Sequence, residues 1–329
     1  MKKILALVLV IAMLATFAAC GGAKEAEYKL GMGISVSLDS SKDQTAQADA
    51  TVATVVLDAE GKIVAADLDC AQTKVKAADV DDLSKVDVRT KKEKKEDYNM
   101  KGASPIGKEW YEQAAAFVEK MVGKTVADIE AIETKEENGH NVAVDADLYA
   151  ACTMDITAFK AAFVAACKDA QAKTFTAAGD IKLGLDVETN VTGSKATEAQ
   201  LYSTFGAIVV DKDGKTLAAI VDEIQPKVTF DEEGVVADKK YTDTKRNLKE
   251  DYNMVKFSPE GTCIAEWYVQ AASLTDYIAE KGMTADEIAA IATADTRNDG
   301  YMRPTDADLA AVCTMQIAGY QAVLANAAK

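Results

Sequence analysis

The sequence predicts an α+β protein built from two tandem copies of one domain, each with an antiparallel sheet followed by helices. The clearest sign is a repeat, because Lys95–Met100 reads KEDYNM and returns as Lys249–Met254. Other matched segments are Glu109–Ala115 with Glu266–Ala272, Asp145–Leu148 with Asp306–Leu309, and Cys152–Met154 with Cys313–Met315. The repeat spans about 150 residues, which is too long for a solenoid unit and fits a domain of ordinary size. Strand-like segments precede helix-like segments in both copies, which indicates the α+β class.

The N-terminus has the pattern of a bacterial secretory signal, which we assign to residues 1–19. Two lysines precede an apolar run from Ile4 to Ala19, and this run is shorter than the roughly 20 residues of a membrane helix. The segment ending at Cys20 resembles a lipobox, which implies cleavage before Cys20 and lipid on its sulfur. We therefore expect a lipid anchor in the cell membrane at the extracytoplasmic face, with residues 20–27 as lipidated cysteine and tether. An uncleaved anchor and an unlipidated export are the alternatives.

The charge and the cysteines exclude several classes of partner. The formal net charge is −16, which argues against nucleic acid because cationic side chains supply that affinity. The chain has six cysteines, including Cys20, but its one histidine is His140 and no Cys/His cluster occurs. Structural zinc and other metals therefore have no ligand set. We expect Cys152 and Cys313 to be small buried apolar residues.

The first domain is expected at 28–172 and the second at 180–329, with Lys173–Gly179 as the short join between them. Lys29–Gly31 opens the first copy as a strand, and Lys182–Gly184 opens the second. A hairpin follows in each copy, because two β-rich segments flank a polar turn that ends in glycine. These paired segments are Ala53–Leu57 with Lys62–Ala66, and Ala207–Val210 with Lys215–Ala219.

The second part of each copy has helical periodicity. Lys91–Glu96 is a run of charges that we expect as a solvated loop or edge strand. From Lys108 to Met121, apolar residues recur at helical spacing, and Trp110 lies on that stripe as Trp267 does in the second copy. Core packing is the favoured role of both tryptophans. Thr125 and Thr284 are expected N-caps of short helices, and a last helix is expected after Thr153 and after Thr314.

The loops before the tryptophan helices are candidate binding loops. Tyr98 and Asn99 in the first copy return as Tyr252 and Asn253 in the second. An aromatic ring and an amide before an aromatic helix could line a ligand pocket. The alternative is structural, with tyrosine packed and asparagine closing a turn at the crossover from sheet to helix.

Few residues in the sequence could support enzymatic catalysis. No Ser/His/Asp set can be built with a match in both copies, because His140 has no counterpart in the second. No glycine-rich phosphate loop of the Walker type is present. We therefore assign no catalytic residue and favour an electron carrier or a binding protein over a catalyst.

The order of these segments resembles the FMN-binding domain family. The carrying features are a strand, an Asp/Gly turn, a strand opening with Gly61-Lys62-Ile63-Val64, and later Ala-Ala-Cys-Thr before a helix. Two such domains behind a lipobox resemble the extracellular electron-transfer lipoproteins of Gram-positive bacteria. In that family a transferase esterifies FMN through its phosphate to the threonine of the motif. Thr153 and Thr314 stand at that position here, while Ala151 and Val312 stand where the family has glycine.

The resemblance implies a membrane-anchored flavoprotein of extracellular electron transport. It implies FMN at Thr153 and Thr314, bound covalently or non-covalently, with an FMN transferase and a membrane electron donor as partners. A phosphate at a helix N-terminus would meet free backbone N–H groups and the positive end of the helix dipole. The alternative is a surface lipoprotein without a redox role, which binds a small ligand or a protein partner through its duplicated domains.

Overall fold

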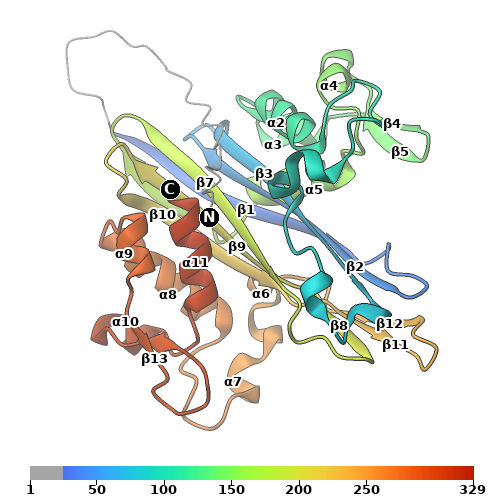
Figure 1. Ribbon diagram of the computed structural model, residues 1–329. Coiled ribbons are helices and arrows are strands. Elements are labelled where there is room, and N and C mark those ends of the chain that lie inside the picture. The colour runs from blue at the N-terminus through green and yellow to red at the C-terminus, as the bar shows by residue number, and fades with distance from the viewer. Residues whose placement is uncertain (1–24) are drawn as a thin grey trace, which may run out of the picture.

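The computed structural model describes residues 25–329. The predicted signal, the predicted lipidation site Cys20 and residues 21–24 of the predicted tether lie outside this range. The predicted mixture of helices with antiparallel sheets is confirmed. Two sheets pack against each other, and helices cover the outer face of each, so the molecule has four layers (Figure 1). We call residues 25–172 the first half and residues 180–329 the second half.

The larger sheet belongs mainly to the first half. Its strands are all antiparallel, in the order β3-β2-β1-β6. Their bounds are β1 Ala26–Ser37, β2 Thr45–Leu57, β3 Ile63–Lys76 and β6 Lys173–Ala177. The predicted hairpin is confirmed as β2–β3, and its turn is closed by Gly61 at φ 75°, a backbone conformation that glycine adopts without strain.

The second half forms a matching hairpin but divides it between two sheets. One sheet has the order β10-β9-β7 and the other β12-β11-β8. Their bounds are β7 Ile181–Asn190, β8 Glu198–Gln200, β9 Tyr202–Asp211, β10 Thr216–Ile224, β11 Lys227–Phe230 and β12 Val236–Lys240. The break lies at Pro226, whose carbonyl accepts from the Leu201 N–H at 2.9 Å. Proline has no N–H for the ladder, so it interrupts here a strand that runs unbroken through Thr73 in the first half.

The sheets are apolar on both faces because both faces are covered. Val55 points to the helices of the first half, and its neighbour Val56 points to the second sheet. The central layer joins the halves in one core, where Leu30 and Val52 share a cluster with Phe205. All four side chains named from the first half are fully buried. A strand that is buried on both faces needs apolar residues at nearly every position, so its sequence is a nearly continuous apolar segment.

Helices form the outer layers and follow the strands in both halves. In the first half these elements are α1 Lys91–Lys94, α2 Trp110–Met121, α3 Val126–Glu130, α4 Ala146–Ala151 and α5 Thr157–Cys167, with a small hairpin of β4 Thr134–Glu137 and β5 His140–Ala143. In the second half they are α6 Lys245–Leu248, α7 Met254–Phe257, α8 Trp267–Glu280, α9 Ala285–Ala289, α10 Ala307–Val312 and α11 Ala318–Ala327, with β13 Thr293–Ala294 and β14 Arg303–Pro304. The predicted caps are confirmed, since Thr125 and Thr284 both form capping boxes.

Three expectations need correction. Lys91–Glu96 is neither a loop nor an edge strand, because Thr90 caps helix α1 there and a 3-10 turn, Lys95–Tyr98, follows it. The expected join contains strand β6, which completes the first sheet by pairing with β1. Ala26 and Glu27, expected in the tether, belong to β1. A local cap orders the first of these segments, and pairing between β1 and β6 orders the other two.

The last helix of each half lies unusually close to the first strand. A Cβ atom on Gly31 would lie 2.2 Å from the backbone oxygen of Ala166 in α5. On Gly184 it would lie 1.8 Å from the backbone oxygen of Ala327 at the end of α11. Neither distance is possible for a real Cβ, so only glycine permits this contact of helix and sheet.

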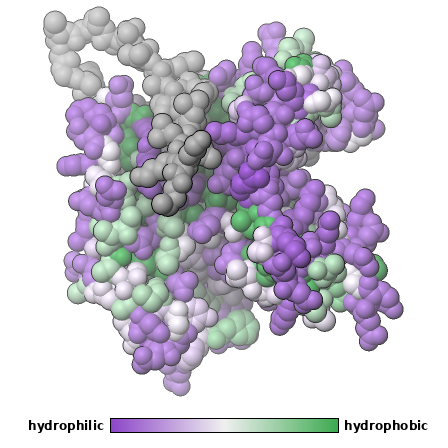
Figure 2. All heavy atoms as spheres, in the orientation of Figure 1, coloured by the Kyte–Doolittle hydropathy of each residue, from purple (hydrophilic) through white to green (hydrophobic). Residues whose placement is uncertain are grey.

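The face shown in Figure 2 is mostly hydrophilic, with apolar side chains gathered in smaller patches. Between residues 25 and 329 no helix combines the length and apolar character that crossing a membrane requires. Within the same range no three His, Cys, Asp or Glu side chains come together as a metal site would need.

Candidate functional site

The two motif threonines lie in loops between helices. Helix α4 ends at Ala151, and Thr153 follows its C-cap, Cys152. Helix α5 begins four positions later, at Thr157. Thr314 has the same place between α10 and α11. Both threonines are half-buried, and neither occupies the N-cap or first turn of a helix.

A buried glutamine holds each of these threonines. The Gln113 carboxamide oxygen accepts from the Thr153 backbone N–H at 2.9 Å and from its hydroxyl at 3.2 Å. Gln270 binds Thr314 in the same way, at 2.6 and 3.2 Å. Both glutamines are fully buried in the tryptophan helices α2 and α8. The repeated Gln-Ala-Ala and Cys-Thr-Met segments therefore meet in space in each half.

The amide nitrogens of the two glutamines extend this clamp to the loop before each tryptophan helix. The Gln113 amide donates to the Ser104 hydroxyl at 3.0 Å and to the Lys108 carbonyl at 3.1 Å. The Gln270 amide donates to the Ala265 carbonyl at 2.6 Å. Each carboxamide thus uses both of its ends, as buried polar groups require. The glutamine clamp, as we call it, fixes loop, helix and motif together.

These surroundings do not fit a phosphate ester on either threonine. The hydroxyl is engaged with a buried glutamine, and the preceding Cys152 and Cys313 are buried. Burial also raises the pKa of both thiols to about 11, which leaves them protonated and unreactive at neutral pH. Neither threonine lines any of the three cavities described below. The first turn of α5 is four residues away, so the helix dipole does not point at the hydroxyl.

The four predicted loop residues do not share one environment. Tyr98 and Tyr252 are partly buried and pack against the helical cores. Asn99 and Asn253 take left-handed backbone conformations, with φ of 58° and 57°, and both close 3-10 turns. Asparagine suits this position because its short polar side chain tolerates the left-handed conformation of a turn. Of the four, Tyr252 lines a cavity.

A lysine lies under each tryptophan helix. The Lys91 ammonium lies 5.1 Å from the ring centre of Tyr98 and 5.7 Å from that of Trp110. Lys245 lies at 4.8 Å from Tyr252 and 5.4 Å from Trp267. Such distances allow cation–π attraction, which strengthens when the charge is removed from water. Both tryptophans are buried, as their positions on the apolar stripes predict.

The second lysine belongs to a buried polar network. Lys245 pairs with the Glu223 carboxylate at 2.9 Å. The Tyr320 hydroxyl donates to the same carboxylate and accepts from the Trp267 indole N–H at 2.9 Å. Burial by itself would lower the pKa of Lys245, but Tyr320 and Glu223 outweigh it and raise that pKa. Burial and the Glu223 charge raise the pKa of Tyr320 well above its ordinary value.

Beside this network lies a cavity of about 500 Å³ with aromatic walls. Its aromatic residues are Tyr202, Tyr241, Tyr252 and Phe257. Two of the rings stand in solvent, since Phe257 is 78% exposed and Tyr241 is 56% exposed. Lys227 and Gln225 add polar groups to the wall. We call this space the aromatic cavity.

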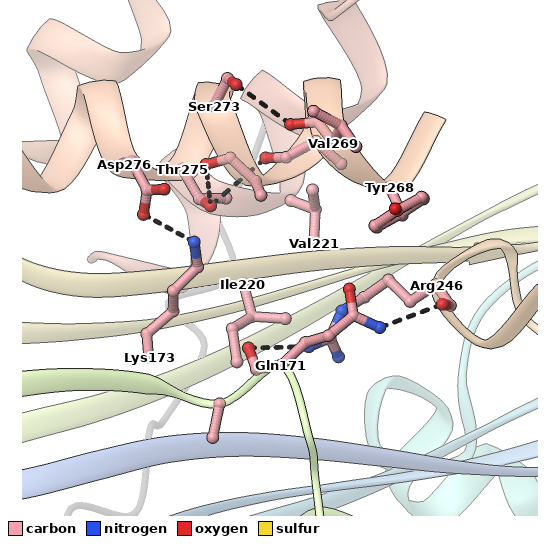
Figure 3. A pocket seen from close by; sticks show the side chains of 13 residues that line it. Gln171, Lys173, Ile220, Val221, Arg246, Tyr268, Val269, Ser273, Thr275 and Asp276 are labelled. Atoms are coloured by element: carbon pink, nitrogen blue, oxygen red, sulfur yellow. Dashed lines mark hydrogen bonds and ion pairs between the residues drawn. The ribbon is translucent and has the colours of Figure 1, made fainter. Parts of the chain in front are cut away.

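Two other cavities lie beside the tryptophan helices. One, of about 480 Å³, lies between α2, β3 and the first residues of β7, so both halves contribute to it. We call it the seam cavity. The other, of about 500 Å³, lies between α8, β10 and the segment Gln171–Lys173. Figure 3 shows Lys173 reaching across this second space to Asp276 on the helix, with a nitrogen–oxygen distance of 2.6 Å. We call it the α8 cavity.

With this geometry in view, the chain was compared with known proteins. No protein family, no curated protein and no solved structure matches it. Its function therefore has to be inferred from its own residues.

Sequence reasoning did not find the three cavities or the glutamine clamp. Gln113 and Gln270 were visible as repeat matches. A glutamine at the same place in two apolar helices is a signal that could have marked them, because a buried polar group needs a hydrogen-bond partner. The seam cavity gave no such signal, because Ile181 and Leu183 reach it from the other half of the chain.

Proposed function

We propose that the chain is a lipid-anchored surface protein made of two copies of one domain, and that it binds a small ring-shaped ligand without a covalent bond. The duplication is supported by matched contacts: a glutamine clamp, a lysine beneath the tryptophan helix and a close contact of glycine with the last helix occur in both halves. The copies would span 28–172 and 180–329, and the first would be completed by β6. Cys20 would carry the lipid and hold the protein on the extracytoplasmic face.

The convergence of four aromatic rings on one cavity carries the binding proposal. Three of these rings have no aromatic counterpart in the first half. Counted from the matched turns and caps, Asp49 stands for Tyr202, Asp87 for Tyr241 and Ala103 for Phe257. These differences between the halves thus gather at one place. Rings that remain exposed, as Phe257 and Tyr241 do, offer faces on which a ligand ring can stack.

A planar heteroaromatic ring is the ligand class that these walls favour, and flavin is the first to test. Tyrosine and phenylalanine faces suit an electron-poor ring. Tyr252 is the predicted cofactor residue that would contact such a ring. Bound flavin would accept and release electrons, and the protein would then carry electrons outward from a membrane donor. A different ring ligand would make it a binding lipoprotein without a redox role.

A fluorescence titration tests the proposal. Riboflavin and FMN, with glucose and a short peptide for comparison, are titrated into the purified chain while the combined emission of Trp110 and Trp267 is followed. We expect saturable quenching by the flavins, weakened about tenfold by Phe257→Ala, which removes roughly 1–2 kcal/mol of stacking. Val312→Ala is the matched control, because Val312 is an exposed apolar residue outside the cavity. Equal quenching in the Phe257 variant, or none in the native chain, would refute a flavin in the aromatic cavity.

The intact mass of the exported protein tests the remaining parts. Lipid on Cys20 predicts loss of residues 1–19 and a gain of acyl mass. The engaged hydroxyls of Thr153 and Thr314 predict no added FMN when the chain is expressed with a flavin transferase. One or two added FMN groups would restore the covalent flavoprotein that the resemblance implies.

A further inference from the structure

The seam cavity differs in its lining from the aromatic cavity. Its walls are mainly apolar and come from both halves. Helix α2 supplies Trp110, Ala114, Ala115 and Val118, and strand β7 supplies Ile181 and Leu183. Cavities of a few hundred Å³ at the junction of two structural units are common ligand sites. Small alanines on the helix keep this space open, since no larger side chain fills it.

Three acids and three lysines line the seam cavity, but they differ in how they are engaged. Each acid is engaged by the protein itself, since Asp67 pairs with Lys92 at 2.6 Å. Glu96 accepts from the Tyr111 hydroxyl at 3.0 Å, and Glu112 accepts from the Glu109 N–H at 2.8 Å.

Two lysines that line the same mouth, Lys95 and Lys182, form no ion pair with any described residue. The cavity therefore offers an apolar floor and two available cations at its entrance.

The α8 cavity provides a comparison within the same chain. It lies at the matching helix, but its cations are both paired. Lys173 binds Asp276 at 2.6 Å, and Arg246 binds Asp169 at 2.9 Å with both side chains buried. Gln171 also donates to the Arg246 carbonyl at 3.0 Å. Figure 3 shows Lys173 and Asp276 bridging the space between β6 and α8. No described cation lining it is left for a ligand.

We propose that the seam cavity binds a single-chain amphipathic anion, with the hydrocarbon part along α2 and the carboxylate or phosphate at Lys95 and Lys182. The apolar walls remove the hydrocarbon part of the ligand from water. The two lysines add charge-assisted hydrogen bonds to the anionic end. This site is separate from the aromatic cavity, so it stands independently of the ligand proposed there.

Isothermal titration calorimetry with dodecanoate tests this inference on the protein without its predicted signal, residues 1–19. We expect saturable binding to the native protein, and little binding of acetate or of dodecyltrimethylammonium. The double variant Lys95→Glu, Lys182→Glu should bind dodecanoate at least tenfold more weakly. Both lysines are only half-buried and form no ion pair with a described residue, so this variant is expected to fold.

A matched pair of variants locates the site. Ala115→Phe fills the seam cavity, and Ala272→Phe makes the same change in the α8 cavity. We expect the first to abolish dodecanoate binding and the second to leave it unchanged, with flavin quenching of tryptophan emission retained in both. Equal losses in both variants, equal binding of the cationic amphiphile, or unchanged binding by the lysine variant would overturn the proposal. Should Ala115→Phe fail to fold, the lysine variant decides.

Discussion

Lys91 and Lys245 occupy matching places beneath the two tryptophan helices, but their neighbours differ. In the second half Glu223 neutralises the ammonium and Tyr320 joins the same carboxylate. In the first half the matching positions hold Cys70 and Phe159, and Phe159 packs edge-on against Trp110 with ring centres 5.8 Å apart. Burial raises the pKa of the Cys70 thiol to about 11, so it carries no charge at neutral pH.

The difference shows that one framework accepts two kinds of interior. The first half uses apolar contacts around its lysine, which adapt to small changes of volume. The second half uses a hydrogen-bonded ion pair, which requires every member because a lone buried charge is costly. Variants at matching positions should therefore have unequal effects.

The largest effect is expected at Glu223. Glu223→Gln leaves the buried Lys245 ammonium without its counter-charge and should lower the free energy of unfolding by about 3–5 kcal/mol. Tyr320→Phe copies the first-half residue Phe159 and should cost less, about 2 kcal/mol, because it removes two buried hydrogen bonds. Urea unfolding measures both. Equal costs for the two variants would show that the carboxylate is not the centre of the network.

The second effect concerns the glycines under the last helices. Gly31→Ala and Gly184→Ala both place a Cβ atom against a helix backbone, and each should cost about 3 kcal/mol. Gly31→Ala should cost more, because a short loop ties α5 to β6, which pairs with the same strand β1 and restricts movement of the helix. The contact of Gly184 is with Ala327, at the last residue of α11. Thermal denaturation compares the two, and a larger loss for Gly184→Ala would contradict this account.

A smaller effect concerns pH. Burial raises the pKa of Asp69 and of Asp222 to about 6, whereas an unfolded aspartate has a pKa of about 3.9. The folded protein therefore keeps these two carboxyls protonated at a higher pH than the unfolded chain does. Its stability should rise as pH falls from 7 to 5, by about 1 kcal/mol per carboxyl. Asp69→Asn and Asp222→Asn should each remove about 1 kcal/mol of this gain in stability, as measured by urea unfolding at pH 7 and at pH 5. An unchanged slope in either variant would exclude that carboxyl as a source.

The smallest effect is a gain of stability at Thr54. Its hydroxyl is the one buried side-chain polar atom without a partner among residues 25–329, and the second half has Ala207 at the matching position. Thr54→Val should raise the free energy of unfolding by about 0.5–1 kcal/mol, because it removes an unsatisfied hydroxyl. The control is Thr189→Val, which breaks a buried hydroxyl pair with Ser203 at 3.0 Å and should be destabilising. Thermal denaturation with a loss at both sites would contradict the assignment.

Local patterns predicted much of the secondary structure. The hairpin glycines, the threonine caps and the tryptophan stripes each depend on a few neighbouring residues, and all were confirmed. Lys91 was misjudged because its burial depends on Tyr98 and Trp110, which no charge pattern reveals. The candidate site was less accessible to prediction. Tyr252 lies in a cavity, but its partners Tyr202 and Tyr241 come from distant segments.

The central apolar layer has a consequence for how the chain must be made. The inner face of the first sheet, including Leu30 and Val52, has no cover until Phe205 and its neighbours arrive from the second half. A ribosome adds only about 5–20 residues per second. For several seconds, the N-terminal part of each nascent chain therefore exposes an apolar sheet face to its surroundings. Production of the N-terminal part alone should yield insoluble material, and a holding chaperone should improve the yield of the full chain.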